Sequence, residues 1–439
     1  MPSTLAEWLS HLESLHPKTI ALGLERVAEV KQRLQLDPRC PVIIVGGTNG
    51  KGSVCAMLES ILHAAGYRTG LYTSPHLLDY NERVRIAKQP VSDAELCASF
   101  EQIELARRGL PPPCRGKESL PSSHAIPLTY FEFGTLAAMQ SFIAHKVDVA
   151  ILEVGLGGRL DAVNVFDCDC AVVTSIDLDH IDYLGDTREK IAFEKAGIFR
   201  AGKVAVFGDP DMPQSIQEQA QQVGAPLWRL GHQFGARAHE QQWDYHGPGG
   251  IRSSLPYPAL RGAFQLNNAS TVLAVLDALK ESLPVSMAAV RRGLLEVQLA
   301  ARFQVLPGRP LLILDVAHNP HAAQSLARNL AGMPPAPRTI AVCAMLKDKD
   351  MAGVVRALAP HIDEWLLAGI AAPRGASADE LRQVLVQEQV SAPVHVFASA
   401  NDAVHHACNA AGENDRIVAF GSFYTVAEVM RARGIRIAN

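Results

Sequence analysis

The chain has 439 residues, of which 48% are hydrophobic and 20% are charged, so it is long enough for two or three globular domains. Its formal net charge of −4 excludes a strongly basic nucleic-acid-binding protein, and we expect no nucleic-acid partner. Apolar runs stay shorter than the roughly 18 residues that span a bilayer, so we expect no membrane association and a cytoplasmic location. Nothing in the sequence demands more than a monomer, which is the state that we expect. The eight cysteines form no Cys-x-x-Cys pair, which predicts buried thiols.

Apolar runs typical of buried strands alternate with helical segments, which predicts an α/β fold with mostly parallel sheets. The strands expected in the first part of the chain are 42–46, 69–73, 147–154, 171–176 and 203–207. The strands expected in the second part are 311–316, 339–344, 365–369, 394–397 and 416–420. Between the two series, residues 225–262 predict loops or short antiparallel strands, and residues 263–298 predict a helical stretch. We therefore expect two domains, residues 1–298 and 299–439.

The segment 42–53 carries the clearest chemical signal, because an apolar run leads into a glycine-rich turn and then a helical pattern. A strand, turn and helix in this order aim backbone N–H groups and a helix N-terminus at an anion. Lys51 can then neutralise phosphate oxygens, and the hydroxyl of Ser53 can bind Mg²⁺. The standard phosphate-loop pattern has glycine in place of Val45 and a hydroxyl residue in place of Gly52. We predict an ATP site in a variant loop, within an N-terminal P-loop ATPase domain.

Two further strands also end in polar residues. Glu153 ends the strand 147–154, just before a glycine turn, and fits the acid that organises Mg²⁺ beside a phosphate loop. His180 follows the strand 171–176 and two aspartates, at the sheet edge where parallel sheets bind ligands. Mg²⁺ usually prefers oxygen ligands, so a hydrogen-bonded loop residue is the alternative interpretation of His180.

A lysine and a second strand end complete the set of candidates. Lys195 lies where a charged helical pattern gives way to apolar residues, and a partly buried lysine with a lowered pKa can react with CO₂ to form a carbamate. A solvated helix face is the alternative for that segment. In the second domain, Asp315 ends a strand, and His318 opens a helix whose N-terminus favours anions. Arg302 lies beside the domain boundary, and Ser422 follows the last strand.

Seven motifs, taken together and in this order, resemble the folylpolyglutamate synthase and dihydrofolate synthase family, relatives of the Mur peptide ligases. The motifs are 47–53, 74–77, 81–84, 129–133, 152–161, 194–199 and 315–320. The resemblance covers almost the whole chain and implies that the second domain is Rossmann-like. It also implies a ligase that uses ATP and two Mg²⁺ ions to add L-glutamate to dihydropteroate and to reduced folates, through an acyl phosphate.

The resemblance further implies roles for individual residues. The catalytic residues would be Lys51, His318 and a carbamylated Lys195. The nucleotide would be bound by Gly50, Lys51, Gly52, Ser53, Asn268, Arg302 and Asp315. The metal ligands would be Ser53, Glu153 and His180. The residues that bind the pterin substrate would be Ile20, Ala21, Leu22, Gly23, Thr129, Tyr130, Phe131, Glu132 and Leu160. The incoming glutamate would face His318 and Ser422.

Three alternatives stay open at this point. One is a monofunctional folylpolyglutamate synthase. Another is a Mur-type ligase of cell-wall precursors, against which the motifs 74–77 and 129–133 argue. The third is a nucleotide-dependent switch without enzyme activity, which leaves Lys195 without a purpose. The proline-rich stretch 107–127 is expected to be a surface loop or an insertion.

Overall fold

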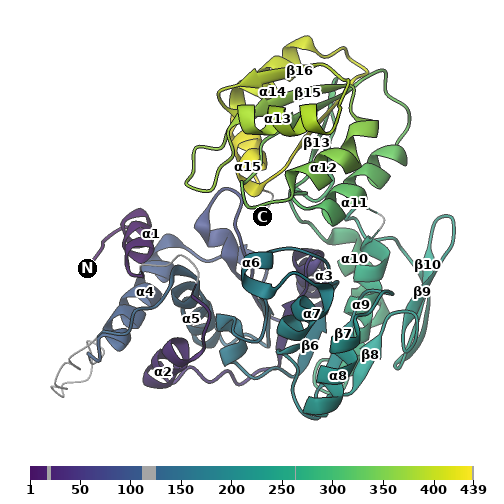
Figure 1. Cartoon of the computed structure of the whole chain (residues 1–439). Coiled ribbons are helices and arrows are strands. Elements are labelled where there is room, and N and C mark those ends of the chain that lie inside the picture. The colour runs from purple at the N-terminus through teal and green to yellow at the C-terminus, as the bar shows by residue number, and fades with distance from the viewer. Residues whose placement is uncertain (17–20, 111–124, 263, 438–439) are drawn as a thin grey trace. The chain divides into compact units, whose positions relative to one another are not determined.

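The protein divides into two compact units, each with its own sheet (Figure 1). The computed structural model describes residues 1–16, 21–110, 125–262 and 264–437. Unit 1 contains residues 1–257 and 267–297, and unit 2 contains residues 258–266 and those from Gln298 onward. The single domain boundary near residue 299 stays a prediction. The predicted second domain, residues 299–439, does not include the segment 258–266, which belongs to unit 2. Ile20 and most of the proline-rich stretch, residues 111–124, lie outside the described residues.

Unit 1 is built on an eight-stranded sheet with β1 between β5 and β6. In sheet order the strands are β4 (Gln89–Pro90), β3 (Val84–Ile86), β2 (Thr69–Tyr72), β5 (Val149–Glu153), β1 (Val42–Gly46), β6 (Cys170–Val173), β7 (Val204–Phe207) and β8 (Leu227–Arg229). The pairings from β2 through β8 are parallel, and β3 is antiparallel to β2 and β4. All five residues of β1 are buried, as expected for a central parallel strand covered on both faces.

Helices cover this sheet on both faces. They are α1 (Leu5–Ser14), α2 (Glu25–Leu34), α3 (Lys51–Ala64), α4 (Asp93–Arg107), α5 (Tyr130–Ala144), α6 (Ile181–Leu184), α7 (Arg188–Ala196), α8 (Gln214–Val223), α9 (Gln265–Ala278) and α10 (Met287–Glu296). The helical character expected over 263–298 is present, but it is divided between two separate helices, α9 and α10. Pro284 lies between them, and the side chain of Ser286 caps the start of α10.

A small antiparallel sheet is attached to α9. Its strands are β9 (Gly235–Ala238), β10 (Trp243–Gly247) and β11 (Gly250–Leu255), so the short antiparallel strands expected within 225–262 are confirmed. The buried carboxylate of Asp277, in α9, accepts hydrogen bonds from Tyr245 Oη (2.7 Å), Gly249 N (3.0 Å) and Arg252 Nη2 (2.6 Å). These bonds fix the small sheet to the helix.

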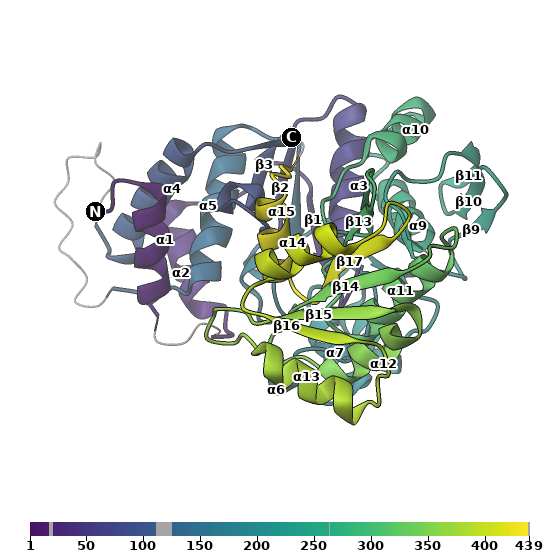
Figure 2. The same ribbon diagram turned by 90° about the horizontal axis from the view of Figure 1, so that it is seen from above.

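Unit 2 is a second α/β layer structure. In sheet order its strands are β12 (Gln304–Leu306), β13 (Leu311–Leu314), β17 (Arg416–Phe420), β14 (Thr339–Cys343), β15 (Glu364–Ala368) and β16 (Val394–Phe397). Figure 2 shows β13, β17, β14, β15 and β16 side by side, and these are parallel, whereas β12 is antiparallel to β13. Its helices are α11 (Pro320–Ala331), α12 (Met351–Leu358), α13 (Ala378–Gln387), α14 (Ala400–Ala410) and α15 (Phe423–Ala432).

The helices of unit 2 form two groups: α11, α12 and α13 pack in sequence, and α14 packs on α15. The predicted α/β architecture with two mostly parallel sheets is thus confirmed, and all ten expected strands are present. Among the described residues, no helix is both long and apolar enough to cross a membrane.

Candidate functional site

The glycine-rich loop between β1 and α3 is fixed by the segment that follows β6. Thr48 N donates to Ser175 O (2.8 Å), and Thr174 Oγ1 donates to Asn49 O (2.6 Å). Gly47 has a φ of 140°, and a Cβ at this position would lie 1.9 Å from Thr174 Oγ1. A side chain at this position is therefore excluded both by the backbone conformation and by the neighbouring strand end. The shape of the loop is therefore fixed by its contacts with Thr174 and Ser175.

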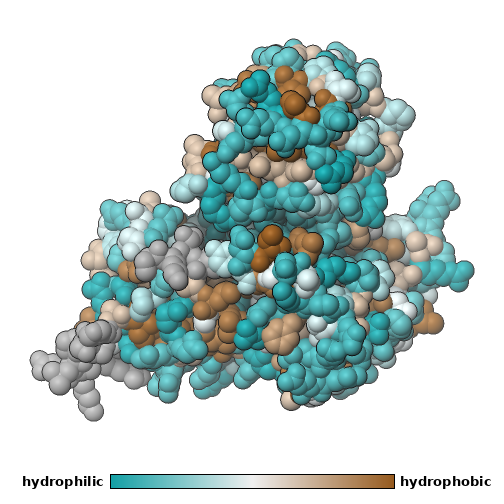
Figure 3. All heavy atoms as spheres, in the orientation of Figure 1, coloured by the Kyte–Doolittle hydropathy of each residue, from teal (hydrophilic) through white to brown (hydrophobic). Residues whose placement is uncertain are grey.

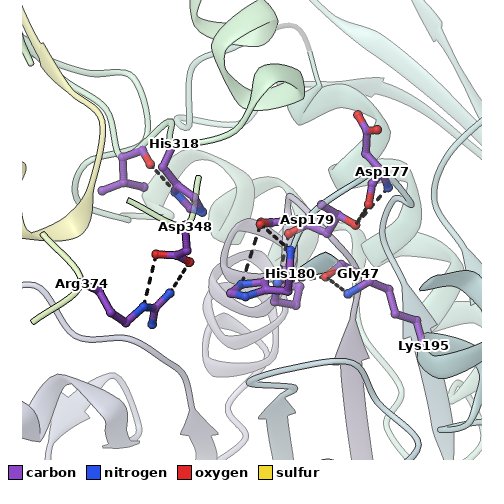
Figure 4. A network of polar contacts seen from close by, with 11 residues as sticks. Gly47, Asp177, Asp179, His180, Lys195, His318, Asp348 and Arg374 are labelled. Atoms are coloured by element: carbon purple, nitrogen blue, oxygen red, sulfur yellow. Dashed lines mark hydrogen bonds and ion pairs between the residues drawn. The ribbon is translucent and has the colours of Figure 1, made fainter. Parts of the chain in front are cut away.

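Two lysine side chains converge on the carbonyl oxygen of Gly47, as Figure 4 shows for Lys195. Lys51 Nζ lies 2.9 Å from this oxygen and Lys195 Nζ lies 2.8 Å from it. Lys195 is 5% exposed, which is more buried than the sequence suggests. Burial, assisted by the positive charge of Lys51, lowers the pKa of Lys195 to about 7. A substantial fraction of Lys195 is therefore a neutral, nucleophilic amine near neutral pH.

Side chains suited to a divalent cation lie at the same edge of the sheet. Ser53 is in the first turn of α3, Glu153 ends β5, and both are buried. Glu153 Oε2 accepts a hydrogen bond from Ser74 N (3.1 Å). The described residues contain no cluster of three or more His, Cys, Asp or Glu side chains that could hold a metal ion. A hydroxyl and a carboxylate are hard oxygen donors that fit Mg²⁺ or Mn²⁺.

His180 lies in an unusual part of the backbone, directly before α6. Its φ is 52°, in the left-handed region, and its backbone N–H donates to Asp179 Oδ1 (2.9 Å; Figure 4). The side chains of Ile181 and Tyr183 are about half exposed, and Figure 3 shows a hydrophobic patch over α6. The segment that carries His180 is thus fixed by its own hydrogen bonds and flanked by exposed apolar side chains.

The structure brings Asn268 of α9 to the phosphate loop. Gly50 has a φ of 89°, and a Cβ at this position would lie 2.9 Å from Asn268 Oδ1. Asn268 is 8% exposed. Its side chain therefore packs over the last turn of the loop.

Three segments expected to bind the pterin substrate also meet in unit 1. Gly23 N donates to Leu160 O (3.4 Å), which joins the loop before α2 to the end of the glycine turn. Arg26 Nη2 donates both to Ala21 O (2.8 Å) and to Glu132 Oε1 (2.9 Å), which joins the same loop to the start of α5. Sequence reasoning missed Arg26, because a single arginine in an amphipathic helix carries no motif.

The expected substrate residues around the start of α5 are held in different ways. Thr129 caps α5, and its Oγ1 accepts a hydrogen bond from Glu132 N (3.2 Å). The ring of Phe131 lies 5.7 Å from the ring of Tyr72, and Tyr130 stacks edge-on against Tyr80. Leu22 lies in the loop before α2 and is partly exposed.

Asp161 is a second residue that the sequence interpretation did not assign to the site. Its Oδ2 accepts a hydrogen bond from Leu156 N (2.8 Å), and its Oδ1 accepts one from Val163 N (3.1 Å). Burial raises the pKa of Asp161 to about 7, against these backbone hydrogen bonds and the charge of Lys195. Its place at the end of the 152–161 motif was the available signal.

Unit 2 gathers its own candidates at the carboxyl ends of its central strands. Asp315 is partly buried, and its oxygens accept hydrogen bonds from Phe303 N and Ala317 N (both 2.8 Å). Desolvation of the carboxylate raises the pKa of Asp315 despite the nearby charge of Arg302. The guanidinium of Arg302 lies over the ring of Phe423 (5.1 Å). These contacts place Arg302 beside the strand end that carries Asp315.

His318 and Ser422 lie at the same edge of that sheet. His318 Nδ1 is 2.7 Å from Val316 O, so the imidazole carries its hydrogen on Nδ1 in this hydrogen bond (Figure 4). Ser422 Oγ caps α15 by accepting from Thr425 N (3.0 Å). The same figure shows an ion pair between Asp348 and Arg374, on the loops after β14 and β15.

Comparison with known proteins identifies two family regions. Residues 121–276 match the Mur ligase middle domain, and residues 301–423 match the Mur ligase glutamate ligase domain. The dihydrofolate synthase/folylpolyglutamate synthase of Escherichia coli K12 is 46% identical over 429 residues, which cover 98% of this chain and 95% of the relative.

Solved structures show the same likeness over the full length. The Escherichia coli FolC structure in complex with DHPP and ADP has a TM-score of 0.90 at 45% identity and covers 99% of both chains. A bifunctional folylpolyglutamate synthase/dihydrofolate synthase with Mn, AMPPNP and L-glutamate bound has a TM-score of 0.87 at 48% identity and covers 98% of both chains. The chain therefore belongs to the dihydrofolate synthase/folylpolyglutamate synthase family of Mur ligases.

Proposed function

We propose that this chain is an ATP-dependent ligase that joins L-glutamate to dihydropteroate and, in a second activity, to reduced folates. One observation carries the proposal: the phosphate loop, Glu153 and Lys195 meet at the carboxyl ends of β1, β5 and β6. This arrangement occurs in a chain that is 46% identical to a dihydrofolate synthase/folylpolyglutamate synthase. A sheet edge of this kind is where open α/β sheets bind their ligands.

The proposed chemistry has two steps, because a carboxylate is a poor acyl donor. In the first, the acceptor's carboxylate takes the γ-phosphoryl group of ATP, which leaves an acyl phosphate and ADP. In the second, the amine of L-glutamate attacks the acyl carbon, phosphate leaves with the bonding electrons, and an amide remains. The N–H groups from Gly50 to Ser53 would hold the phosphates at the start of α3. Lys51, after leaving the Gly47 carbonyl, would neutralise the charge that develops on the phosphoryl group.

A divalent cation would be held by Ser53, Glu153 and His180. When bound, such an ion neutralises phosphate charge and orients the transferring group. We further propose a second ion beside a carbamylated Lys195. The neutral amine of Lys195 would add to CO₂, forming an N–C bond with loss of one proton, and the resulting carboxylate would be a further oxygen ligand.

The remaining residues keep the roles implied by family resemblance. Asn268, Arg302 and Asp315 would contact the nucleotide, and His318 and Ser422 would face L-glutamate. The pterin substrate would be bound by Ile20, Ala21, Leu22, Gly23, Thr129, Tyr130, Phe131, Glu132 and Leu160. In support, hydrogen bonds join three of these segments within unit 1.

The central test is Lys51→Ala, measured as ADP release with L-glutamate and either dihydropteroate or a reduced folate. The variant should fold normally and lose ADP release with both acceptors, because the phosphoryl charge is no longer neutralised. Lys190→Ala is the matched control, since Lys190 is exposed and pairs with Asp186 (2.8 Å) on the protein surface. Near-normal turnover of Lys51→Ala contradicts the assignment of the loop.

The same assay separates the alternatives. In the presence of L-glutamate, ADP release with a reduced folate but not with dihydropteroate identifies a monofunctional folylpolyglutamate synthase. ADP release only with a UDP-linked muramyl acceptor identifies a cell-wall ligase. ATP binding without glutamate-dependent release identifies a switch. The cytoplasmic location and the monomeric state stay predictions, which cell fractionation and light scattering test.

A further inference from the structure

One guanidinium group in α2 links two of the segments proposed to hold the pterin substrate. Arg26 Nη2 donates to Ala21 O (2.8 Å) in the loop before α2 and to Glu132 Oε1 (2.9 Å) in the first turn of α5. Arg26 Nε adds a longer hydrogen bond to Glu132 Oε2 (3.4 Å). A planar guanidinium can serve a carboxylate and a carbonyl at fixed angles, whereas an ammonium is a point charge on a flexible stem.

The carboxylate of Glu132 is committed to partners within the protein. Its side chain is 4% exposed, and Oε2 also accepts a hydrogen bond from Thr129 N (2.7 Å) at the N-terminus of α5. A buried carboxylate needs both hydrogen bonds and a positive partner, and Arg26 is that partner. Glu132 is thus held as part of the wall of the site.

The same loop is tied to a third segment. Gly23 N donates to Leu160 O (3.4 Å), so a loop held by Arg26 is also aligned with the end of the glycine turn. The phosphate loop is fixed by different groups, namely Ser175, Thr174 and Lys195. A change at Arg26 therefore disturbs the acceptor segments and spares the contacts that shape the nucleotide loop.

We infer that Arg26 is a positioning residue, which sets the spacing between the Ala21–Gly23 loop and the Thr129–Glu132 turn so that the pterin substrate finds a preformed site. The inference rests on the proposed function, because it assumes that these segments bind that substrate. Loss of the bridge lets the loop sample other positions, and the apparent affinity falls by the fraction of time that the correct position is populated.

The test uses Arg26→Gln and Arg26→Lys in ADP-release assays, with dihydropteroate varied at saturating ATP and L-glutamate. We expect the KM for dihydropteroate to rise at least about tenfold, corresponding to a correct loop position populated for a tenth of the time or less. We expect the KM values for ATP and L-glutamate to stay within about twofold, since the nucleotide loop is fixed separately.

A matched control lies in the same helix. Arg33 is 27% exposed, against 25% for Arg26, and it likewise binds a carbonyl and a carboxylate: Ala106 O (2.8 Å) and Glu29. Arg33→Gln and Arg33→Lys should leave the KM for dihydropteroate unchanged. A rise equal to that of the Arg26 variants would mean that general loosening of α2 is the cause, and it would overturn the inference.

A double variant covers the case in which Arg26→Gln folds poorly. Arg26→Gln/Glu132→Gln leaves no unpaired buried charge, so it should fold better than either single variant. Because a glutamine at position 26 cannot bridge Ala21 and residue 132 in the same way, the KM for dihydropteroate should still be raised. A wild-type KM in this double variant overturns the inference alone. A wild-type chain that releases no ADP with dihydropteroate overturns the proposed function and this inference with it.

Discussion

Replacing Gly47 by alanine should disable the phosphate loop while replacing Gly66 should not. Gly47 precedes α3 and Gly66 follows it, and both have a positive φ, of 140° and 95°. The left-handed region costs an L-residue about 1–2 kcal/mol in either place. At Gly66 nothing lies within 4 Å of a new Cβ, so that cost is the whole effect.

At Gly47 a steric term is added, because the new Cβ would lie 1.9 Å from Thr174 Oγ1 and 3.0 Å from Thr174 N. Thr174 must move, which breaks its 2.6 Å hydrogen bond to Asn49 O, and an unmade buried hydrogen bond costs about 1–3 kcal/mol. The free energy of unfolding should therefore fall by about 2–5 kcal/mol for Gly47→Ala. The fall for Gly66→Ala should be about 1–2 kcal/mol.

Urea unfolding and ATP-dependent ADP release measure the two effects. We expect kcat/KM for ATP to fall at least about 100-fold for Gly47→Ala, and to stay within about twofold for Gly66→Ala. Because both glycines have a positive φ, the comparison tests the added contact with Thr174. If the two variants have the same activity and stability, Thr174, which directly follows β6, does not hold the phosphate loop in shape.

Three further outcomes follow from the same contacts. Asp277→Ala leaves the Arg252 guanidinium and two other donors without their acceptor. The free energy of unfolding, measured by urea titration, should therefore fall by about 3 kcal/mol. A loss below about 1 kcal/mol contradicts the role of Asp277 in anchoring the small sheet to α9. With ¹³C-labelled bicarbonate and fixed dissolved CO₂, a carbamate NMR signal should grow from pH 6 to pH 8. The reason is that the neutral fraction of Lys195 rises as the pH passes its pKa of about 7. The signal should be absent in Lys195→Arg. A signal that does not change with pH argues against Lys195 as the carbamylated residue. Removal of divalent cations with EDTA should stop ADP release and Mn²⁺ should restore it, whereas activity that persists in EDTA rejects the metal site.

The sequence predicted most of the elements that position the site, because buried parallel strands leave a strong apolar signal. The phosphate loop, Glu153 and Lys195 could be named from their places at strand and helix ends. The split between α9 and α10 was missed because both helices are apolar enough to continue one pattern. Pro284 was the local signal that the helical stretch is interrupted.

Contacts between distant segments could not be predicted in the same way. Lys51 and Lys195 are 144 positions apart, and their shared acceptor, the Gly47 carbonyl, depends on how α7 packs beside the loop. Arg26 and Glu132 are likewise joined only in the folded chain. Side-chain pairs of this kind follow from tertiary packing, which neither spacing nor composition records.

The segment 258–266 belongs to unit 2 although it lies far from the rest of that unit in the sequence. Phe264 belongs to unit 2, where its ring lies 4.7 Å from the guanidinium of Arg328 and 5.2 Å from the ring of His321, both on α11. The aromatic ring that packs on α11 therefore precedes residues 267–297 of unit 1 in the sequence, whereas α11 follows them. A recombination event between related genes at residues 298 and 299 would exchange α11 without the aromatic ring that packs on it. Such a crossover preserves these contacts only where both parents carry a compatible residue at position 264. Exchange of unit 2 with these contacts intact therefore needs the segment 258–266 as well as the residues from Gln298 onward.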